Sequence, residues 1–131
     1  MKINKKNIFI IVLVVVIILL CLYFLIFKMD SKKYKYTKEL KKIASEYYED
    51  YYDRFEKFNY TSDQIEKELS KYKENGRKDT LDTLSRIDVT KTDEILSKFE
   101  GCNIHNTNAI VYPYEPYGKK DYKVVITLDC E

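Results

Sequence analysis

The sequence has little glycine or proline and no tryptophan: its 131 residues include three Gly, two Pro and one His. It contains no catalytic, metal-binding or nucleotide-binding motif, and no Cys-x-x-Cys pair of the kind used by redox enzymes and zinc sites. The sequence therefore predicts a protein that is not an enzyme and that holds no cofactor and no metal.

The charge of the chain excludes a class of partner. Three of the 23 basic residues, Lys2, Lys5 and Lys6, lie near the N-terminus, so residues from Lys28 onward carry 20 bases and 21 acids. A nucleic-acid-binding domain is expected to carry a basic excess, and we therefore expect no nucleic acid partner. Lysine outnumbers arginine 20 to 3, which is typical of an AT-rich genome and favours a bacterial source.

Residues 8–27 are the strongest feature of the sequence. These 20 residues carry no charge, and as a helix they span about 30 Å, the hydrocarbon thickness of a bilayer. A cleavable signal peptide has a shorter apolar run that ends in small residues, whereas this run ends in Leu25-Ile26-Phe27. Cys21 follows Leu20 rather than a small residue, so we interpret it as an apolar thiol and not as a lipid-attachment site. We expect an uncleaved transmembrane helix at residues 8–27, in contact with the lipid bilayer, after a tail of residues 1–7.

Two signals for the orientation of this anchor oppose each other. The lysines on the C-terminal side are more numerous than those of the tail, which alone would place the domain in the cytoplasm: Lys28, Lys32, Lys33, Lys35 and Lys38. The short lysine-containing tail resembles the start of a secretory signal, and the paired cysteines described below suit an oxidising compartment. We expect a cytoplasmic tail and an extracytoplasmic domain at the cell membrane. The same lysines are interpreted either as a solvated helix start or as contacts to anionic headgroups.

The next segment, residues 28–60, has the pattern of a juxtamembrane amphipathic helix. No Gly or Pro separates it from the membrane segment, so the two helices are expected to be continuous or nearly so. Its apolar residues recur at intervals of three and four: Tyr36, Leu40, Ile43, Tyr47, Tyr51, Phe55 and Phe58. Four tyrosines of this segment are interpreted as core, with an aromatic platform for glycan or ring stacking as the alternative: Tyr47, Tyr48, Tyr51 and Tyr52.

Residues 61–101 have the pattern of short helices. Thr61 with Gln64 predicts a capping box for a helix that carries Ile65, Leu69 and Tyr72 on one face and stops at Asn75-Gly76. Further helical turns are expected after Asp79 and over residues 93–99, and they depend on tertiary contacts because they are short.

Residues 102–131 predict a cysteine-closed β-hairpin. Two strand-like runs, residues 103–112 and 121–129, flank a turn that contains Pro113, Pro116 and Gly118. A disulfide between Cys102 and Cys130, placed directly opposite each other, sets a register centred on Pro116. This register gathers one apolar face: Ile104, Ile110, Tyr112, Tyr122, Val124, Ile126 and Leu128. A zinc site that uses Cys102 and His105 is the weaker alternative, because the alternation turns His105 away from the cysteines. The fold class is therefore α+β: a transmembrane helix, then a small domain of a long amphipathic helix, shorter helices and a disulfide-closed hairpin.

The tip of the hairpin is the candidate site for binding a partner. It concentrates aromatic and proline residues where a plain turn needs only Gly or Asn; the candidates are Tyr112, Tyr114, Glu115, Pro116 and Tyr117. The alternative is that some of these tyrosines fold back into the core.

Three functions follow from this plan. The first is a non-catalytic, extracytoplasmic binding or interaction module of a bacterial cell envelope, with an envelope protein or wall component as partner. The second is a structural subunit of a pilus or secretion apparatus, because an apolar N-terminal helix that leads into an amphipathic helix and a cysteine-closed sheet resembles the type IV pilin plan; the Gly and Glu that pilin precursors carry at the start are absent around Lys6-Asn7-Ile8. The third is an envelope-polymer hydrolase that uses Glu49, Asp50 and Asp53, although a charged outer helix face explains these carboxylates equally.

Overall fold

The computed structural model describes residues 4–131, without the side chains of residues 28–30. Residues 1–3, including Lys2 of the predicted tail, lie outside the described residues. The chain forms two compact units, Met1–Tyr34 and Lys35–Glu131, which are taken in turn below.

The first unit consists of the N-terminal part of helix α1 (Lys5–Lys57). This part is strongly apolar, and its apolar stretch is not buried within the protein. The large apolar side chains from Ile8 to Phe27 are all exposed, each to at least 46%. By length and composition this helix is sufficient to cross a bilayer.

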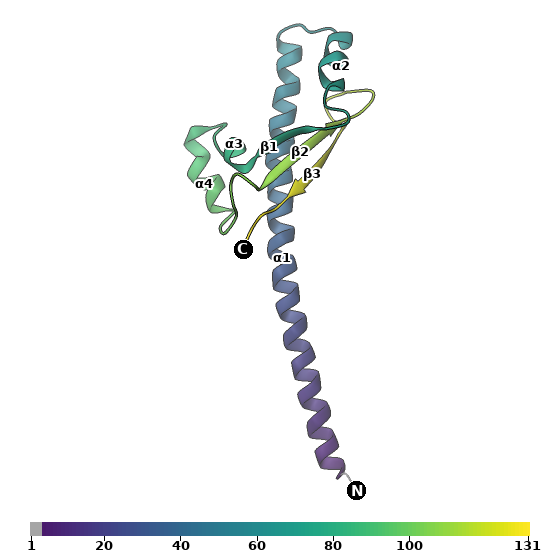
Figure 1. The fold of residues 1–131 in the computed structure, drawn as a ribbon, viewed down its shortest axis with the longest axis vertical. Coiled ribbons are helices and arrows are strands. Elements are labelled where there is room, and N and C mark those ends of the chain that lie inside the picture. The colour runs from purple at the N-terminus through teal and green to yellow at the C-terminus, as the bar shows by residue number, and fades with distance from the viewer. Residues whose placement is uncertain (1–3) are drawn as a thin grey trace. The chain divides into compact units, whose positions relative to one another are not determined.

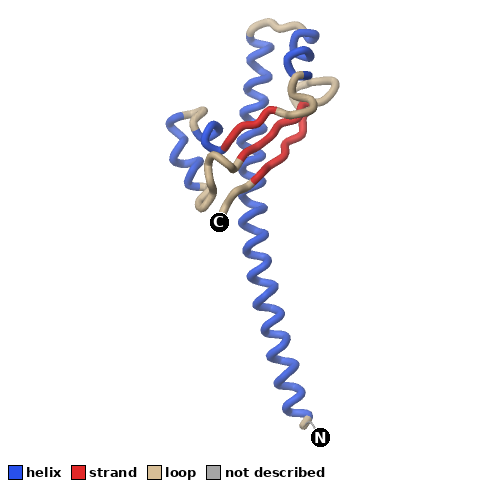
Figure 2. Tube along the Cα trace, in the orientation of Figure 1, coloured by secondary structure: helices blue, strands red, loops and turns tan. Residues whose placement is uncertain are grey.

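The second unit combines helices with a small antiparallel sheet, so the α+β class predicted from the sequence is confirmed (Figure 1). Its elements after α1 are α2 (Ser62–Ser70), β1 (Arg77–Thr80), α3 (Leu81–Ser85), the 3-10 helix η1 (Val89–Lys91), α4 (Thr92–Ser97), β2 (Asn108–Pro113) and β3 (Tyr122–Thr127). Within this unit the strands cross α1, while α3 and α4 lie beyond one end of the sheet (Figures 1 and 2).

Helix α1 buries one face, as its three- and four-residue spacing predicts. Tyr36, Leu40, Ala44, Tyr48 and Phe55 are buried, and Ile43, Tyr47 and Tyr51 are half-buried. The prediction is wrong at Phe58, which is 68% exposed because α1 ends at Lys57 and a turn begins there. The capping box of α2 is confirmed: the Gln64 amide donates to Thr61 Oγ1 at 3.2 Å, and the Thr61 amide donates to Gln64 Oε1 at 2.8 Å.

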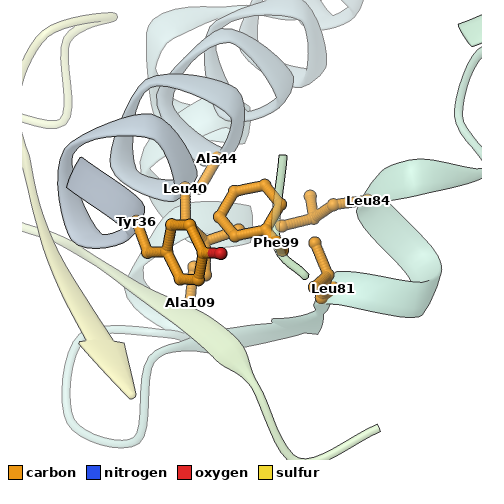
Figure 3. Close-up of a cluster of buried hydrophobic side chains, with 7 residues drawn as sticks. All are labelled: Tyr36, Leu40, Ala44, Leu81, Leu84, Phe99 and Ala109. Atoms are coloured by element: carbon orange, nitrogen blue, oxygen red, sulfur yellow. The ribbon is translucent and has the colours of Figure 1, made fainter. Parts of the chain in front are cut away.

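The core of the second unit has two parts. In the first, shown in Figure 3, Tyr36, Leu40 and Ala44 of α1 face side chains from the rest of the domain, which are Leu81, Leu84, Phe99 and Ala109. The second lies further along α1 and joins it to α2, β2 and the hairpin tip; its buried members are Tyr48, Phe55, Ile65, Leu69, Val111 and Tyr117. The buried face of α1 is therefore covered jointly by the sheet, by α2 and α3, and by the hairpin tip.

The strand order is β1-β2-β3, with both pairs antiparallel. Strand β1 was not predicted, because Arg-Lys-Asp-Thr contains no apolar residue and resembles a helix start. Arg77 nevertheless pairs with Val111, whose side chain is buried, and its guanidinium lies 4.0 Å from the centroid of the Tyr51 ring and 5.1 Å from that of Tyr47. A cation over aromatic faces replaces the apolar side chain that a core position usually carries.

The predicted pairing of Cys102 with Cys130 is confirmed as a disulfide across an isolated antiparallel bridge. The register inferred from it is wrong within the strands: Val111 pairs with Val124 and Ala109 with Ile126, so Ile110 and Tyr112 lie on the opposite face of the sheet from Val124. The cause is a turn at residues 103–107, where the Thr107 amide donates to the Asn103 carbonyl at 2.9 Å. The strand predicted at residues 103–112 therefore begins only at Asn108.

Gly76 directly precedes β1 and has a φ of +71°. A Cβ at this position would lie 2.3 Å from Ile110 Cγ2. Gly76→Ala is expected to lower the free energy of unfolding by about 2 kcal/mol, from left-handed backbone strain plus overpacking. Gly101→Ala is the matched control, because Gly101 also has a positive φ (+84°) but is exposed. Urea unfolding of both variants separates the two contributions; equal losses would show that the contact with Ile110 contributes nothing.

Candidate functional site

The hairpin tip divides its predicted binding residues into exposed and buried ones. Tyr114 is 48% exposed, and Glu115 and Pro116 are exposed beside it. Tyr112 is half-buried on β2, and Tyr117 is only 4% exposed within the second part of the core. The surface available to a partner at this tip is therefore Tyr114-Glu115-Pro116.

The loop behind this surface is firmly held. The Tyr117 amide donates to the Tyr114 carbonyl at 2.8 Å, and the Gly118 amide donates to Asp121 Oδ2 at 2.8 Å. The next two residues form ion pairs with α1. Lys119 Nζ lies 3.0 Å from Asp53 Oδ1, and Lys120 pairs with Glu49. The hydrogen bond to Asp53 raises the pKa of Lys119. These contacts attach the loop that follows the tip to α1.

The three carboxylates of the hydrolase hypothesis have different surroundings. Asp53 bonds Lys119, and Glu49 pairs with Lys120, so both hold the hairpin loop on α1. Asp50 lines a separate groove, described below. Two of the three carboxylates therefore attach the hairpin loop to α1.

The tyrosines considered as a stacking platform face inward. Tyr48 is 2% exposed, and its ring lies 4.7 Å from that of Tyr122. Burial raises the pKa of Tyr48. Tyr47 and Tyr51 flank the Arg77 guanidinium, and Arg77 Nη2 donates to the Tyr47 hydroxyl at 3.1 Å. Arg77 therefore covers one face of each of these two half-buried rings, and Tyr47 also lines the groove described below.

An open groove that the sequence did not reveal lies along α1. It has a volume of about 350 Å³, within the range of ligand pockets. One wall consists of α1 residues, and the other comes from the segment from α3 to just beyond α4. The lining residues are Glu39, Lys42, Ile43, Glu46, Tyr47 and Asp50 on the first wall, and Leu84, Ile87, Asp88, Lys91, Glu94, Ile95 and Lys98 on the second.

One ion pair crosses this groove. Lys98 Nζ lies 3.1 Å from Glu39 Oε1 and joins the two walls. Asp88 accepts hydrogen bonds from the Thr90 amide at 3.1 Å and from the Thr90 hydroxyl at 2.6 Å, which lower the pKa of its carboxyl. The groove therefore combines apolar lining residues, such as Ile43 and Ile95, with charged ones, such as Glu46 and Glu94.

Residues 4–131 contain no group of three or more His, Cys, Asp or Glu placed to hold a metal ion. Cys102 is in the disulfide, so it is not available for the zinc site considered from the sequence. His105 is exposed, and its Nδ1 lies 4.0 Å from Asp82 Oδ2. The arrangement offers a surface ion pair when the histidine is protonated.

Comparison of the chain with protein-family models, with curated proteins and with solved structures gave no match.

Proposed function

We propose that this protein is a membrane-anchored, non-catalytic binding module of a bacterial cell envelope, with its tail in the cytoplasm and its folded domain outside. The anchor is supported by residues 8–27, which are apolar on every side and are not covered by protein. The extracytoplasmic address is supported by the Cys102–Cys130 disulfide, since such bonds persist in oxidising compartments.

The observation that carries the binding function is the exposed Tyr114-Glu115-Pro116 surface on a rigid base. Tyr117 is buried directly behind it, and Lys119 is bonded to Asp53 of α1. A preordered loop loses little conformational entropy when it binds, and exposed tyrosines frequently dominate the energetics of interfaces. The partner that this surface suits is an envelope protein or wall component.

A photo-crosslinking side chain at position 114 is expected to give one discrete adduct in native membranes. Tyr60 is the matched control position, because it is also an exposed aromatic residue (43%) but lies in the turn between α1 and α2. Tyr114→Ala is expected to weaken binding of the captured partner at least about tenfold, as for a hot-spot tyrosine. The same adduct from positions 114 and 60, or unchanged binding by Tyr114→Ala, would reject the tip as the binding surface.

A structural subunit related in plan to type IV pilins is the second candidate. It is favoured by the packing of the C-terminal part of α1, including Leu40 and Tyr48, against a three-stranded antiparallel sheet that is followed by a disulfide. This candidate requires a processing cleavage within the first ten residues, so that the mature chain begins after Lys2. A mature chain that retains Met1 or begins at Lys2 excludes it.

A further inference from the structure

The groove along α1 has the dimensions of an elongated ligand. Its α1 wall presents Glu39, Lys42, Glu46 and Asp50 at intervals of three and four residues, so they follow one another along the helix. From Glu39 to Asp50 the row extends about 16 Å, which corresponds to about three helical turns.

The floor of the groove is apolar. Ile43 and Tyr47 of α1 face Leu84, Ile87 and Ile95 of the opposite wall. Leu84 is buried in the core, but Ile87 is 47% exposed although it is a large aliphatic residue. The floor therefore offers apolar surface that a ligand with its own apolar face would cover.

The rim is acidic on balance. Once Glu39 and Lys98 are paired with each other, four carboxylates remain against two amines, Lys42 and Lys91. All four are exposed and take part in no salt bridge in the part of the chain that the structure describes. Asp88 is hydrogen-bonded to Thr90, which leaves Glu46, Asp50 and Glu94 for a ligand. A cationic ligand gains from these charges, and an anionic one is repelled.

We propose that the groove binds a basic amphipathic helix of a partner protein, which lies along α1 with its apolar face on Ile43, Ile87 and Ile95 and its lysine or arginine side chains on Glu46, Asp50 and Glu94. Shallow grooves that take helices recognise apolar anchors at the same three- and four-residue spacing that the rim carboxylates follow here. The site is separate from the hairpin tip and does not depend on the proposed function of Tyr114.

The test uses the full chain in nanodiscs of zwitterionic phosphatidylcholine, and binding to empty nanodiscs of the same lipid is subtracted because an amphipathic peptide also partitions into a neutral bilayer. The probe is a synthetic 14-residue Leu/Lys peptide with an amphipathic helical pattern, and its binding is measured by fluorescence anisotropy. The triple variant Glu46→Gln, Asp50→Asn, Glu94→Gln is expected to bind about tenfold more weakly, since each exposed charge pair contributes modestly. The matched control, Asp63→Asn, Glu66→Gln, Glu74→Gln, removes three exposed acids elsewhere and is expected to leave binding unchanged.

The apolar half of the proposal needs its own comparison. Ile87→Ser, and separately a Ser/Lys peptide of the same charge, are each expected to weaken binding at least about fivefold, because each removes apolar contact from one side. Failure of the Leu/Lys peptide to bind overturns the proposal. Equal losses in the acid variant and its control also overturn it, by showing charge attraction without a site. Equal binding of the Ser/Lys peptide overturns it in favour of a site for small cations.

Discussion

Cys102→Ser is expected to lower the free energy of unfolding of the second unit by about 3 to 4 kcal/mol. The disulfide joins residues separated by 28 positions, and the loop-closure entropy that it removes from the unfolded chain has this size. Typical domains are stable by about 5 to 15 kcal/mol, so the variant loses a large share of its stability. Urea unfolding of the full chain in detergent, followed by tyrosine fluorescence, measures the difference.

The chain supplies its own control for this prediction. Cys21 is a free cysteine in the apolar part of α1, and Cys21→Ser is expected to leave the unfolding of the second unit unchanged. A reducing agent is expected to shift the wild-type curve onto that of Cys102→Ser, and to leave Cys102→Ser itself unaffected. If the wild-type protein shows two alkylated thiols at these positions when it is isolated without reductant, the disulfide is absent from it, and the support for an extracytoplasmic domain is lost with it.

The features that the sequence predicted correctly depend on short-range signals. Thr61 and Gln64 define a helix start through two hydrogen bonds within four residues, and the structure has both. The one-sided burial of α1 follows from the spacing of its apolar residues and needs no knowledge of the sheet. The pairing of Cys102 with Cys130 can be predicted because the two strand-like runs between them have similar lengths.

The hairpin register and strand β1 could not be predicted, because specific polar side-chain contacts determine the backbone at both places. Asn103 accepts hydrogen bonds at its Oδ1 from the amides of His105 and Asn106, which forms a turn inside what the sequence suggested was strand. Arg77 occupies a half-buried position of β1 through its contacts with Tyr47 and Tyr51. Neither arrangement leaves an apolar periodicity to detect, since each depends on a specific polar contact.

The groove could not be predicted for a different reason. Its two walls are separated in sequence by more than thirty residues, from Asp50 to Leu84, and its apolar floor uses positions that local patterns assign to ordinary helix faces. Its position in the sequence places Asp50 with Glu49 and Asp53 in the hydrolase hypothesis. Packing separates them: two bond the hairpin loop, and Asp50 turns to the groove.

Tyr117→Ala is expected to lower the free energy of unfolding by about 3 kcal/mol, the cost of removing a large aromatic side chain from a core. Tyr117 is 4% exposed and lies in one cluster with Tyr48, Phe55 and Val111. Tyr114→Ala, three residues earlier in the same loop, is expected to change stability by no more than about 0.5 kcal/mol, because its side chain is 48% exposed. Tyr117→Phe keeps the ring in place and is expected to lose less than about 1 kcal/mol.

These variants distinguish a residue that holds the tip in place from one that contacts the partner. Tyr117→Ala is expected to weaken crosslinking from position 114 as well, since it removes the buried ring that packs the loop against α1. Tyr117→Phe is expected to retain both stability and crosslinking, because burial of the ring rather than the hydroxyl holds the loop against α1. If Tyr117→Phe loses crosslinking while it keeps its stability, the Tyr117 hydroxyl belongs to the binding surface, and the division of the tip into a buried base and an exposed face is wrong.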